Sequence, residues 1–348
     1  MTDSKKFRIA LSADAFNADG SPVFRHMGLN VLDAQSHIDY WAIDEVLSPM
    51  TAAQIKNANG LLVLTPATSA ETLAAADDLL AVARYGVGYD NVDVAACTQN
   101  DVLLIIAAGA VDRSVAEATI GWMISLTHHM RVKDQLLRQG RWTERNGYMG
   151  RELRDRTFGA VGLGGIARET IRLLGAFGME KPLAFDPFVD PVAAAEMGVE
   201  LVGLDELMGR ADFVSIHCPL NEHTRNLIGA EQIALMKMDA YLINTARGGI
   251  VEEDALFAAL SEKRIAGAAL DCFVGEPINT PHRFGTLENV MLAPHSIAWT
   301  DELFRDIGQT VCQAMVDLSL GKLPAKGIIN PEVLEKESFQ AKWRRLRQ

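Results

Sequence analysis

GAVGLGGIARETIRLLGAFG, residues 159–178, is the stretch that decides the fold. Gly162, Gly164 and Ala167 fit the pattern G-x-G-x-x-[G/A], which is a weak signal by itself because 28 of the 348 residues are glycine. The flanking sequence strengthens it: TFGAVG (157–162) predicts a buried strand and residues 165–178 predict a helix. Asp186 then ends the next apolar run, PLAFD, at the distance expected in a dinucleotide-binding βαβ unit.

Each part of this unit has a physical role in nucleotide binding. Gly162 permits a tight turn, Gly164 lets the backbone approach a pyrophosphate, and Ala167 is small enough for the helix to pack on the sheet. The helix N-terminus attracts the anion. Asp186 can accept hydrogen bonds from ribose hydroxyls and would repel a 2′-phosphate, and DPFVDP (186–191) offers no Arg or Lys in compensation. We therefore expect NAD (NADH) as the cofactor, and NADP is disfavoured.

Composition excludes several other classes of protein. A formal net charge of −12 argues against a nucleic-acid partner and against an anionic membrane surface. No stretch of about 18 apolar residues is present, so no membrane span is expected. The N-terminus, MTDSKKFRIALSADA, lacks the apolar region of a signal peptide and indicates a cytoplasmic protein. The four cysteines form no C-x-x-C or zinc-type cluster, so we expect buried free thiols and no metal site.

Apolar β-type runs alternate with helical segments along the whole chain. This alternation predicts parallel sheets covered by helices on both faces, and ten runs are too many for one sheet. The fold class is therefore α/β, with two Rossmann-like doubly wound parallel-sheet domains. The runs are FRIALS (7–12), GLLVLT (60–65), LLAVAR (79–84), VLLIIA (102–107), FGAVGL (158–163), PLAFD (182–186), FVSIHC (213–218), AYLINT (240–245), AGAALD (266–271) and NVMLAP (289–294).

The domain boundary follows from two helical segments. Residues 114–142 predict one unusually long helix that links the first unit to the second, and residues 301–321 predict a helix that crosses back to close the first unit. The first domain is thus expected at 1–107 with 300–330, and the second at 108–299. Residues 331–348 form a basic C-terminal tail, either a strap on the protein's own surface or a segment that docks on a partner subunit.

Three charged or titratable residues follow successive predicted strands. Arg247 follows AYLINTA, Glu276 lies just beyond AGAALDCF, and His295 follows NVMLAP. Ligands of doubly wound sheets bind at the carboxyl ends of the strands, so we expect the three side chains to converge. A guanidinium grips a carboxylate, and a His paired with a Glu transfers the proton that must accompany hydride transfer.

Several ordered motifs resemble those of the D-isomer-specific 2-hydroxyacid dehydrogenases. They are GLGGIARE, INTARGGIVEEDAL, ALDCFVGEP, LAPHSIAWT, RYGVGYDNVDVAACTQNDV (84–102) and SIHCPLNEHTRNLIG (215–229). The resemblance is greatest to the branch of 3-phosphoglycerate dehydrogenases and glyoxylate/hydroxypyruvate reductases. It implies an NAD-dependent oxidoreductase that interconverts a small 2-oxo acid and its (R)-2-hydroxy acid, built as a homodimer. It also implies a flavodoxin-like substrate domain, a Rossmann domain for NAD, and a cleft between them.

The resemblance also implies residue roles. Arg247 binds the substrate, His295 is the general acid/base and Glu276 is its partner. Val87 and Gly88 receive the substrate carboxylate through their backbone. The implied cofactor-binding residues are Gly162, Gly164, Gly165, Ile166, Asp186, His217, Cys218, Pro219, Thr224, Ala246, Asp271 and His295.

Some features depart from the family pattern. Gly165 stands where Arg or a similar residue is commoner. The loop LTPATSAET (64–72) has no Arg or Lys, so a phosphorylated substrate is disfavoured. Trp299 stands four residues after His295, where it either closes the substrate pocket or packs between domains. Two alternatives stay open: a same-fold dehydrogenase of an unusual acid, such as phosphite or a sulfonated hydroxy acid, and an NAD-sensing, corepressor-like binding protein.

Overall fold

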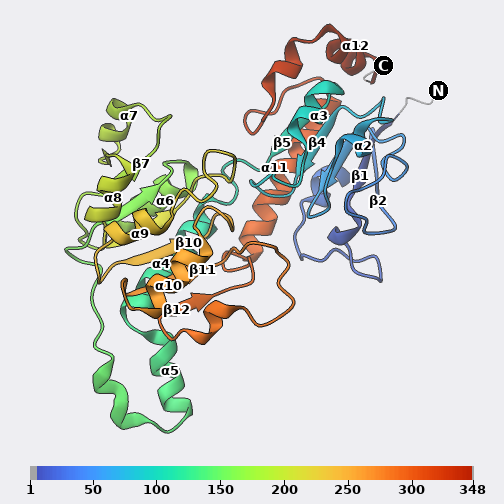
Figure 1. The fold of residues 1–348 in the computed structure, drawn as a ribbon. Helices are drawn as coiled ribbons and strands as arrows, with labels where there is room; N and C mark the ends of the chain where they lie inside the picture. The colour runs from blue at the N-terminus through green and yellow to red at the C-terminus, as the bar shows by residue number, and fades with distance from the viewer. Residues whose placement is uncertain (1–5, 347–348) are drawn as a thin grey trace. The chain divides into compact units, whose positions relative to one another are not determined.

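The computed structural model describes residues 6–346, which form two compact units (Figure 1). Unit 1 contains residues 6–111 and 299–346, and unit 2 contains residues 112–298. These limits lie close to the expected junctions at 107/108 and 299/300. Residues 1–5 and 347–348, which hold the start of the first predicted domain and the end of the predicted tail, lie outside the described residues.

Unit 1 is built on a parallel five-stranded sheet in the order β2-β1-β3-β4-β5. Its strands are β1 (Phe7–Leu11), β2 (Ile38–Ala42), β3 (Gly60–Val63), β4 (Ala81–Arg84) and β5 (Leu103–Ile106). Its helices are α1 (Leu29–Asp33), α2 (Ala70–Leu73), α3 (Val94–Gln99), α11 (Asp301–Ser319) and α12 (Glu337–Leu346). As predicted, the segment 301–321 supplies a helix to this unit; α11 packs against α1 and β4.

Unit 2 is built on a parallel seven-stranded sheet in the order β12-β11-β10-β9-β6-β7-β8. Its strands are β6 (Phe158–Val161), β7 (Leu183–Phe185), β8 (Glu200–Leu201), β9 (Phe213–Ile216), β10 (Tyr241–Asn244), β11 (Gly267–Leu270) and β12 (Val290–Leu292). Its helices are α4 (Asp112–Thr127), α5 (Met130–Arg138), α6 (Gly165–Leu174), α7 (Pro191–Glu196), α8 (Leu204–Arg210), α9 (Ala230–Leu235) and α10 (Glu253–Ser261). The order reverses between β9 and β6, where doubly wound sheets bind their ligands.

The strands of unit 2 are buried on both faces, which explains their continuous apolar sequences. Phe158 and Ala160 of β6 lie in one core with residues of α4 and α6, whereas Val161 lies in the opposite core with residues of α8, α9 and α10. All ten predicted strands are present. Two strands were missed: β2 contains Asp39 and is an edge strand of unit 1, and β8 has only two residues.

The single long helix predicted over 114–142 is wrong. α4 ends at Thr127 and α5 begins at Met130, and His129 between them has a left-handed φ of 52°. The turn allows Arg131 to donate hydrogen bonds to the backbone carbonyls of Leu287, Glu288 and Val290, a contact that local helical periodicity cannot indicate. A short 3-10 helix, Trp142–Gly147, follows.

The described part of the C-terminal tail packs on unit 1. Phe339 and Trp343 of α12 are buried, and the Trp343 indole N–H donates to the carbonyl of Leu318 at 2.8 Å. Lys342 Nζ donates to the backbone carbonyls of Leu79, Asn100 and Asp101. Burial lowers the pKa of Lys342. The tail thus covers its own unit, as the first of the two alternatives expects.

Across residues 6–346, the helices all lack the length and apolarity that a membrane crossing requires.

Gly308 of α11 provides a test of close packing in unit 1. A Cβ there would lie 2.3 Å from the backbone carbonyl carbon of Met27, so Gly308→Ala should lower the free energy of unfolding by about 2 kcal/mol or more. Gly121→Ala is the matched control, because this exposed position in α4 has no neighbouring atom within 4 Å of a Cβ. There we expect a gain of roughly 0.5–1 kcal/mol. Calorimetry measures the free energy of unfolding of both variants. If the two substitutions change it equally, the close approach of Gly308 to Met27 is contradicted.

Candidate active site

The carboxyl ends of the strands in unit 2 form one row. Parallel pairing places Val161, Ile216, Asn244, Leu270 and Leu292 side by side in register. The predicted cofactor and catalytic residues of this unit all follow strands that end on this row or, for Asp186, the adjoining strand β7.

The glycine loop joins β6 to α6 at the switch point of the sheet. Gly162 has a φ of 96°, and a Cβ on it would lie 2.8 Å from the backbone N of Cys218 in the loop after β9. Gly164 has no atom within 4 Å of a Cβ, so the space beside it is open. A Cβ on Gly165 would lie 2.1 Å from Oδ2 of Asp112, so the Asp112 carboxylate lies directly against this turn.

Asp186 is bound to the glycine loop by its own side chain. Its Oδ2 accepts a hydrogen bond from Leu163 N at 2.8 Å, and its Oδ1 accepts one from Phe188 N at 2.9 Å. The carboxylate therefore fixes both the glycine loop and the turn after β7. Ile166 lies half-buried in the first turn of α6.

The loop after β9 forms the other side of the switch point. His217 N donates to the carbonyl of Val161, and burial lowers the pKa of the His217 ring to about 4. The ring is therefore neutral near pH 7, which suits a pocket wall better than a proton donor. Cys218 and Pro219 follow, and Thr224 Oγ1 donates to the Pro219 carbonyl at 2.6 Å.

These loops have the features that a dinucleotide requires. The first turn of α6 presents backbone N–H groups beside the open space at Gly164. Among the described residues, His217 Nε2 and Thr245 Oγ1 are buried without a hydrogen-bond partner, and both stand directly after strands of this row. Unpartnered polar atoms at the same edge as a glycine loop fit a polar ligand there.

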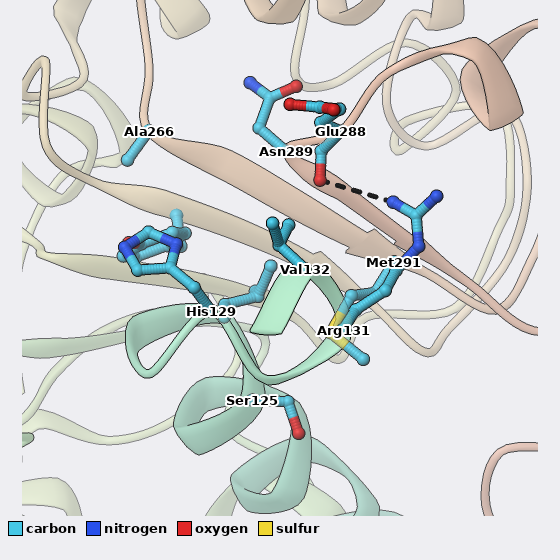
Figure 2. A pocket seen from close by; sticks show the side chains of 10 residues that line it. Ser125, His129, Arg131, Val132, Ala266, Glu288, Asn289 and Met291 are labelled. Atoms are coloured by element: carbon cyan, nitrogen blue, oxygen red, sulfur yellow. Dashed lines mark hydrogen bonds between the residues drawn. The ribbon is translucent and has the colours of Figure 1, made fainter. Parts of the chain in front are cut away.

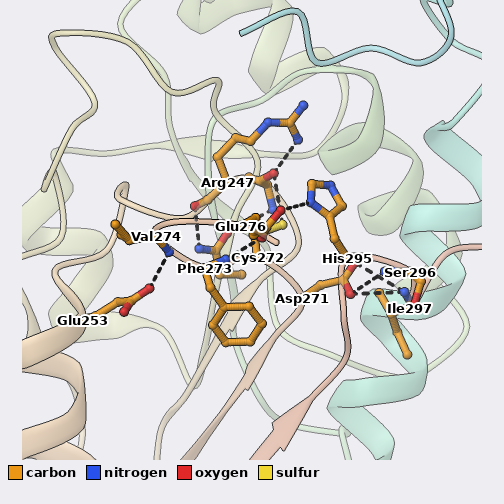
Figure 3. Close-up of polar contacts among 12 residues, drawn as sticks. Arg247, Glu253, Asp271, Cys272, Phe273, Val274, Glu276, His295, Ser296 and Ile297 are labelled. Carbon is orange, nitrogen blue, oxygen red and sulfur yellow. Dashed lines mark hydrogen bonds and ion pairs between the residues drawn. The ribbon is translucent and has the colours of Figure 1, made fainter. Parts of the chain in front are cut away.

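His295 and Glu276 form the central pair of the site (Figure 3). The imidazole Nδ1 lies 2.7 Å from Glu276 Oε2, and the other carboxylate oxygen accepts from Phe273 N at 2.7 Å. Burial alone would raise the pKa of Glu276, but hydrogen bonds from His295 and Phe273, with the charge of Arg247, hold it below its usual value. The carboxylate is thus ionised at neutral pH and faces the imidazole.

Arg247 extends from the loop after β10 to the same side as His295 (Figure 3). Its Nη1 donates to the Ala246 carbonyl at 2.8 Å. Asn244, which is buried, orders this loop: its Nδ2 donates to the Arg247 carbonyl and its Oδ1 accepts from Ala246 N. A Cβ on Gly248 would lie 2.1 Å from backbone atoms of Phe273, so glycine allows the loops after β10 and β11 to touch.

Asp271 orders the loop that carries His295. Its Oδ1 accepts from Ser296 N at 2.8 Å and Ile297 N at 3.2 Å, and its backbone carbonyl accepts from His295 N. Burial raises the pKa of Asp271, and the two backbone hydrogen bonds oppose that rise in part. The family resemblance implies a cofactor-binding role for Asp271, and neither its ordering role nor that of Asn244 was predicted. The only signal for either in the sequence is a polar residue at the end of an apolar run.

The comparisons with known proteins fit this geometry. Residues 120–296 match the family model described as "D-isomer specific 2-hydroxyacid dehydrogenase, NAD binding domain". The glyoxylate reductase of Korarchaeum cryptofilum is 33% identical over 313 residues, which are 88% of this chain and 94% of that protein. The chain belongs to the D-isomer specific 2-hydroxyacid dehydrogenase family. This membership supports NAD as the cofactor.

Other relatives carry different names within the family. The D-3-phosphoglycerate dehydrogenase of Methanocaldococcus jannaschii is 38% identical over 288 residues, 82% of this chain and 54% of that protein. The chain spans about half the length of the phosphoglycerate dehydrogenases that it matches. The crystal structure of the PH0520 protein from Pyrococcus horikoshii shares the fold, with a TM-score of 0.80 and 23% identity over 97% of this chain and 99% of that one.

The residues predicted for the substrate side of the family site belong to unit 1, apart from Arg247. Val87 and Gly88 follow β4. Trp299 is 56% exposed, and its ring packs edge-on against Phe24 and Phe304, with centroids 5.4 and 5.3 Å away. Its two predicted roles stay open.

A small cavity of about 60 Å³ lies at the amino ends of the unit 2 strands, opposite the ends that carry the candidate site (Figure 2). His129 and Arg131 face Ala266, Glu288 and Asn289 there, at the amino ends of the strands. Its volume holds about two waters, and it is far too small for a dinucleotide.

Proposed function

We propose that this chain is an NAD-dependent oxidoreductase that interconverts a small 2-oxo acid and its (R)-2-hydroxy acid. The observation that carries the proposal is the His295–Glu276 pair, whose Nδ1 and Oε2 atoms lie 2.7 Å apart. The pair lies at the carboxyl ends of the strands, which also carry Arg247 and the glycine loop. Unit 2 is the NAD-binding domain in this proposal. Unit 1, with the predicted segments 1–107 and 300–330, is the substrate domain.

The proposed roles follow from the chemistry of a ketone. NADH, when bound, supplies the hydride that the carbonyl carbon accepts. His295 donates the proton that the resulting alkoxide needs, and the Glu276 carboxylate stabilises the imidazolium before transfer and fixes the ring. Arg247 binds the substrate carboxylate and polarises its carbonyl. Asp271 positions His295 through the backbone of residues 296 and 297.

Unit 1 favours a small, unphosphorylated acid. The loop 64–72 carries no cation, and Thr65 N donates to the carboxylate of Asp14 at 2.9 Å, so a negative charge already lies at this loop. A phosphate group would be repelled there. The exposed edge of Trp299 suits contact with a small or apolar substituent.

His295→Gln should lower kcat/KM for reduction by about 10²–10⁴-fold, because it removes the proton donor. The assay is NADH oxidation with glyoxylate, hydroxypyruvate, pyruvate, 2-oxoisocaproate, phenylpyruvate and 3-phosphohydroxypyruvate, with NADPH in parallel. His128→Gln, at an exposed position after α4, is the matched control and should keep full activity. A folded His295→Gln protein that keeps wild-type kcat/KM would refute the assignment.

The same panel tests the substrate class. Activity with NADH on one or more unphosphorylated acids supports the proposal, and preference for 3-phosphohydroxypyruvate would overturn the unphosphorylated class. If NADH binds but no acid reacts, the unusual-acid dehydrogenase and the NAD-sensing binding protein take its place.

Glu276→Gln should lower kcat/KM for reduction by about tenfold or more, because a neutral amide cannot stabilise the imidazolium as a carboxylate does. The pKa of Glu276 lies below its usual value, so the wild-type carboxylate stays charged as the pH falls from about 7 to about 5. The ratio of wild-type to variant kcat/KM should therefore stay constant over that range. A ratio that falls toward one at the acidic end would contradict the ionised pair.

We also propose a cytoplasmic homodimer. The four cysteines are free thiols, as suits a reducing compartment. The segment after α4 projects from unit 2 in Figure 1 and exposes Leu137, Trp142 and Met149 at 65%, 62% and 82%. Such a patch suits burial against a second copy.

Light scattering should give twice the mass of one chain, and Leu137→Glu with Trp142→Glu should give a monomer. Val192→Glu, exposed at 67% in α7, should not.

A further inference from the structure

Cys272 lies beside the two residues of the acid–base pair. Cys272, Glu276 and His295 each offer one possible ligand atom for a metal. These three atoms lie within 4.8 Å of one another. Figure 3 draws the sulfur next to the Glu276 carboxylate. Two of the three residues come from one loop, after β11, and His295 comes from the loop after β12. No C-x-x-C spacing is involved, so the sequence pattern predicted no metal site.

Hydrogen bonds hold each of the three residues in place. Cys272 Sγ donates to the Ala246 carbonyl at 3.3 Å, and Glu276 accepts from Phe273 N. His295 N donates to the Asp271 carbonyl at 2.8 Å. The three donor atoms already lie within 4.8 Å of one another, so part of the entropic cost of assembling a metal site is met before an ion binds.

The donor set matches one class of ion. A thiolate sulfur, an imidazole nitrogen and a carboxylate oxygen are the ligands that Zn²⁺ takes in proteins, and three protein ligands with one open position are typical of accessible zinc sites. The side chains of His295 and Glu276 are 42% and 31% exposed, so an ion can reach them from solvent. Sulfur and nitrogen disfavour Mg²⁺ and Ca²⁺, which prefer oxygen.

Local charge also favours a divalent cation. Glu276 lies next to a second carboxyl group, that of Asp271, close enough for the two to interact electrostatically. Arg247 lies near Glu276 as the opposing positive group. The surroundings of the three donors are thus rich in oxygen and sulfur groups that attract a divalent cation.

We propose that Cys272, Glu276 and His295 bind one Zn²⁺ and that the bound ion inhibits the enzyme. The sulfur, carboxylate and imidazole each donate a lone pair to the metal, and the thiol proton passes to solvent. The imidazole and carboxylate then no longer share a proton, so His295 cannot deliver one to substrate. The binding site stands on the geometry alone, whereas inhibition rests on the proposed function.

Direct binding tests the site without any assay of turnover. Wild-type protein titrated with ZnCl₂ in a calorimeter should bind one ion per chain, and Co²⁺ in its place should give a thiolate-to-metal charge-transfer absorption. Cys272→Ala should lose that absorption and weaken Zn²⁺ binding at least about tenfold, since even outer-shell losses cost 10–100-fold. Cys97→Ala, a buried cysteine in unit 1, is the matched control and should bind as wild type does.

The outcomes separate the site from the proposed function. Equal Zn²⁺ affinity in wild type and Cys272→Ala, or Co²⁺ bound without the thiolate absorption, overturns the site. Zinc bound through Cys272 while activity is unaffected overturns inhibition. Inhibition that follows zinc occupancy, is reversed by EDTA and is weakened in Cys272→Ala supports both parts. If no acid in the panel reacts, the proposed function fails, and the calorimetry still decides the site.

Discussion

The parallel register of the unit 2 sheet is the constraint on which the rest of the site depends. Because Val161, Ile216, Asn244, Leu270 and Leu292 pair in one row, the loops that follow them leave the sheet at the same edge. Backbone hydrogen bonds hold this row, and the close-packed cores on both faces resist a slip, since a one-residue shift would move each side chain into the opposite core, where its shape does not fit. Residues more than a hundred positions apart are thereby brought to one place.

Close contacts between neighbouring loops then fix the positions of the site residues more narrowly. Gly162 touches the loop after β9 and Gly248 touches the loop after β11, at distances that a Cβ would not allow. Polar side chains complete the order: Asn244 holds the Arg247 loop, Asp186 holds the glycine loop, and Asp271 holds the His295 loop. The scaffold thus fixes the reacting groups from several directions, as a preorganised site requires.

Electrostatics divides the titratable residues by environment. Glu276 stays charged because it accepts two hydrogen bonds and lies near Arg247, whereas the buried His217 ring stays neutral because no partner offsets its burial. Two histidines that follow neighbouring parallel strands therefore differ in use: His295 has a carboxylate partner, whereas the Nε2 atom of His217 is buried without one. The same negative groups that serve proton transfer also place Cys272 in a setting that favours a soft divalent cation.

The sequence by itself determined the ten predicted strands, the glycine turn and the strand-end positions of Arg247, Glu276 and His295, because these depend on local hydrophobic period and on residues directly adjacent in the chain. Tertiary structure alone decided the rest. The edge strand β2 forms although Asp39 interrupts its apolar pattern, the helix breaks at His129 to let Arg131 reach distant carbonyls, and α12 is buried through Trp343. Cys272 looks like any buried thiol until the loops after β11 and β12 meet. Contacts between distant segments produce no hydrophobic periodicity in the local sequence. They stabilise the fold only after the sheet has brought those segments together.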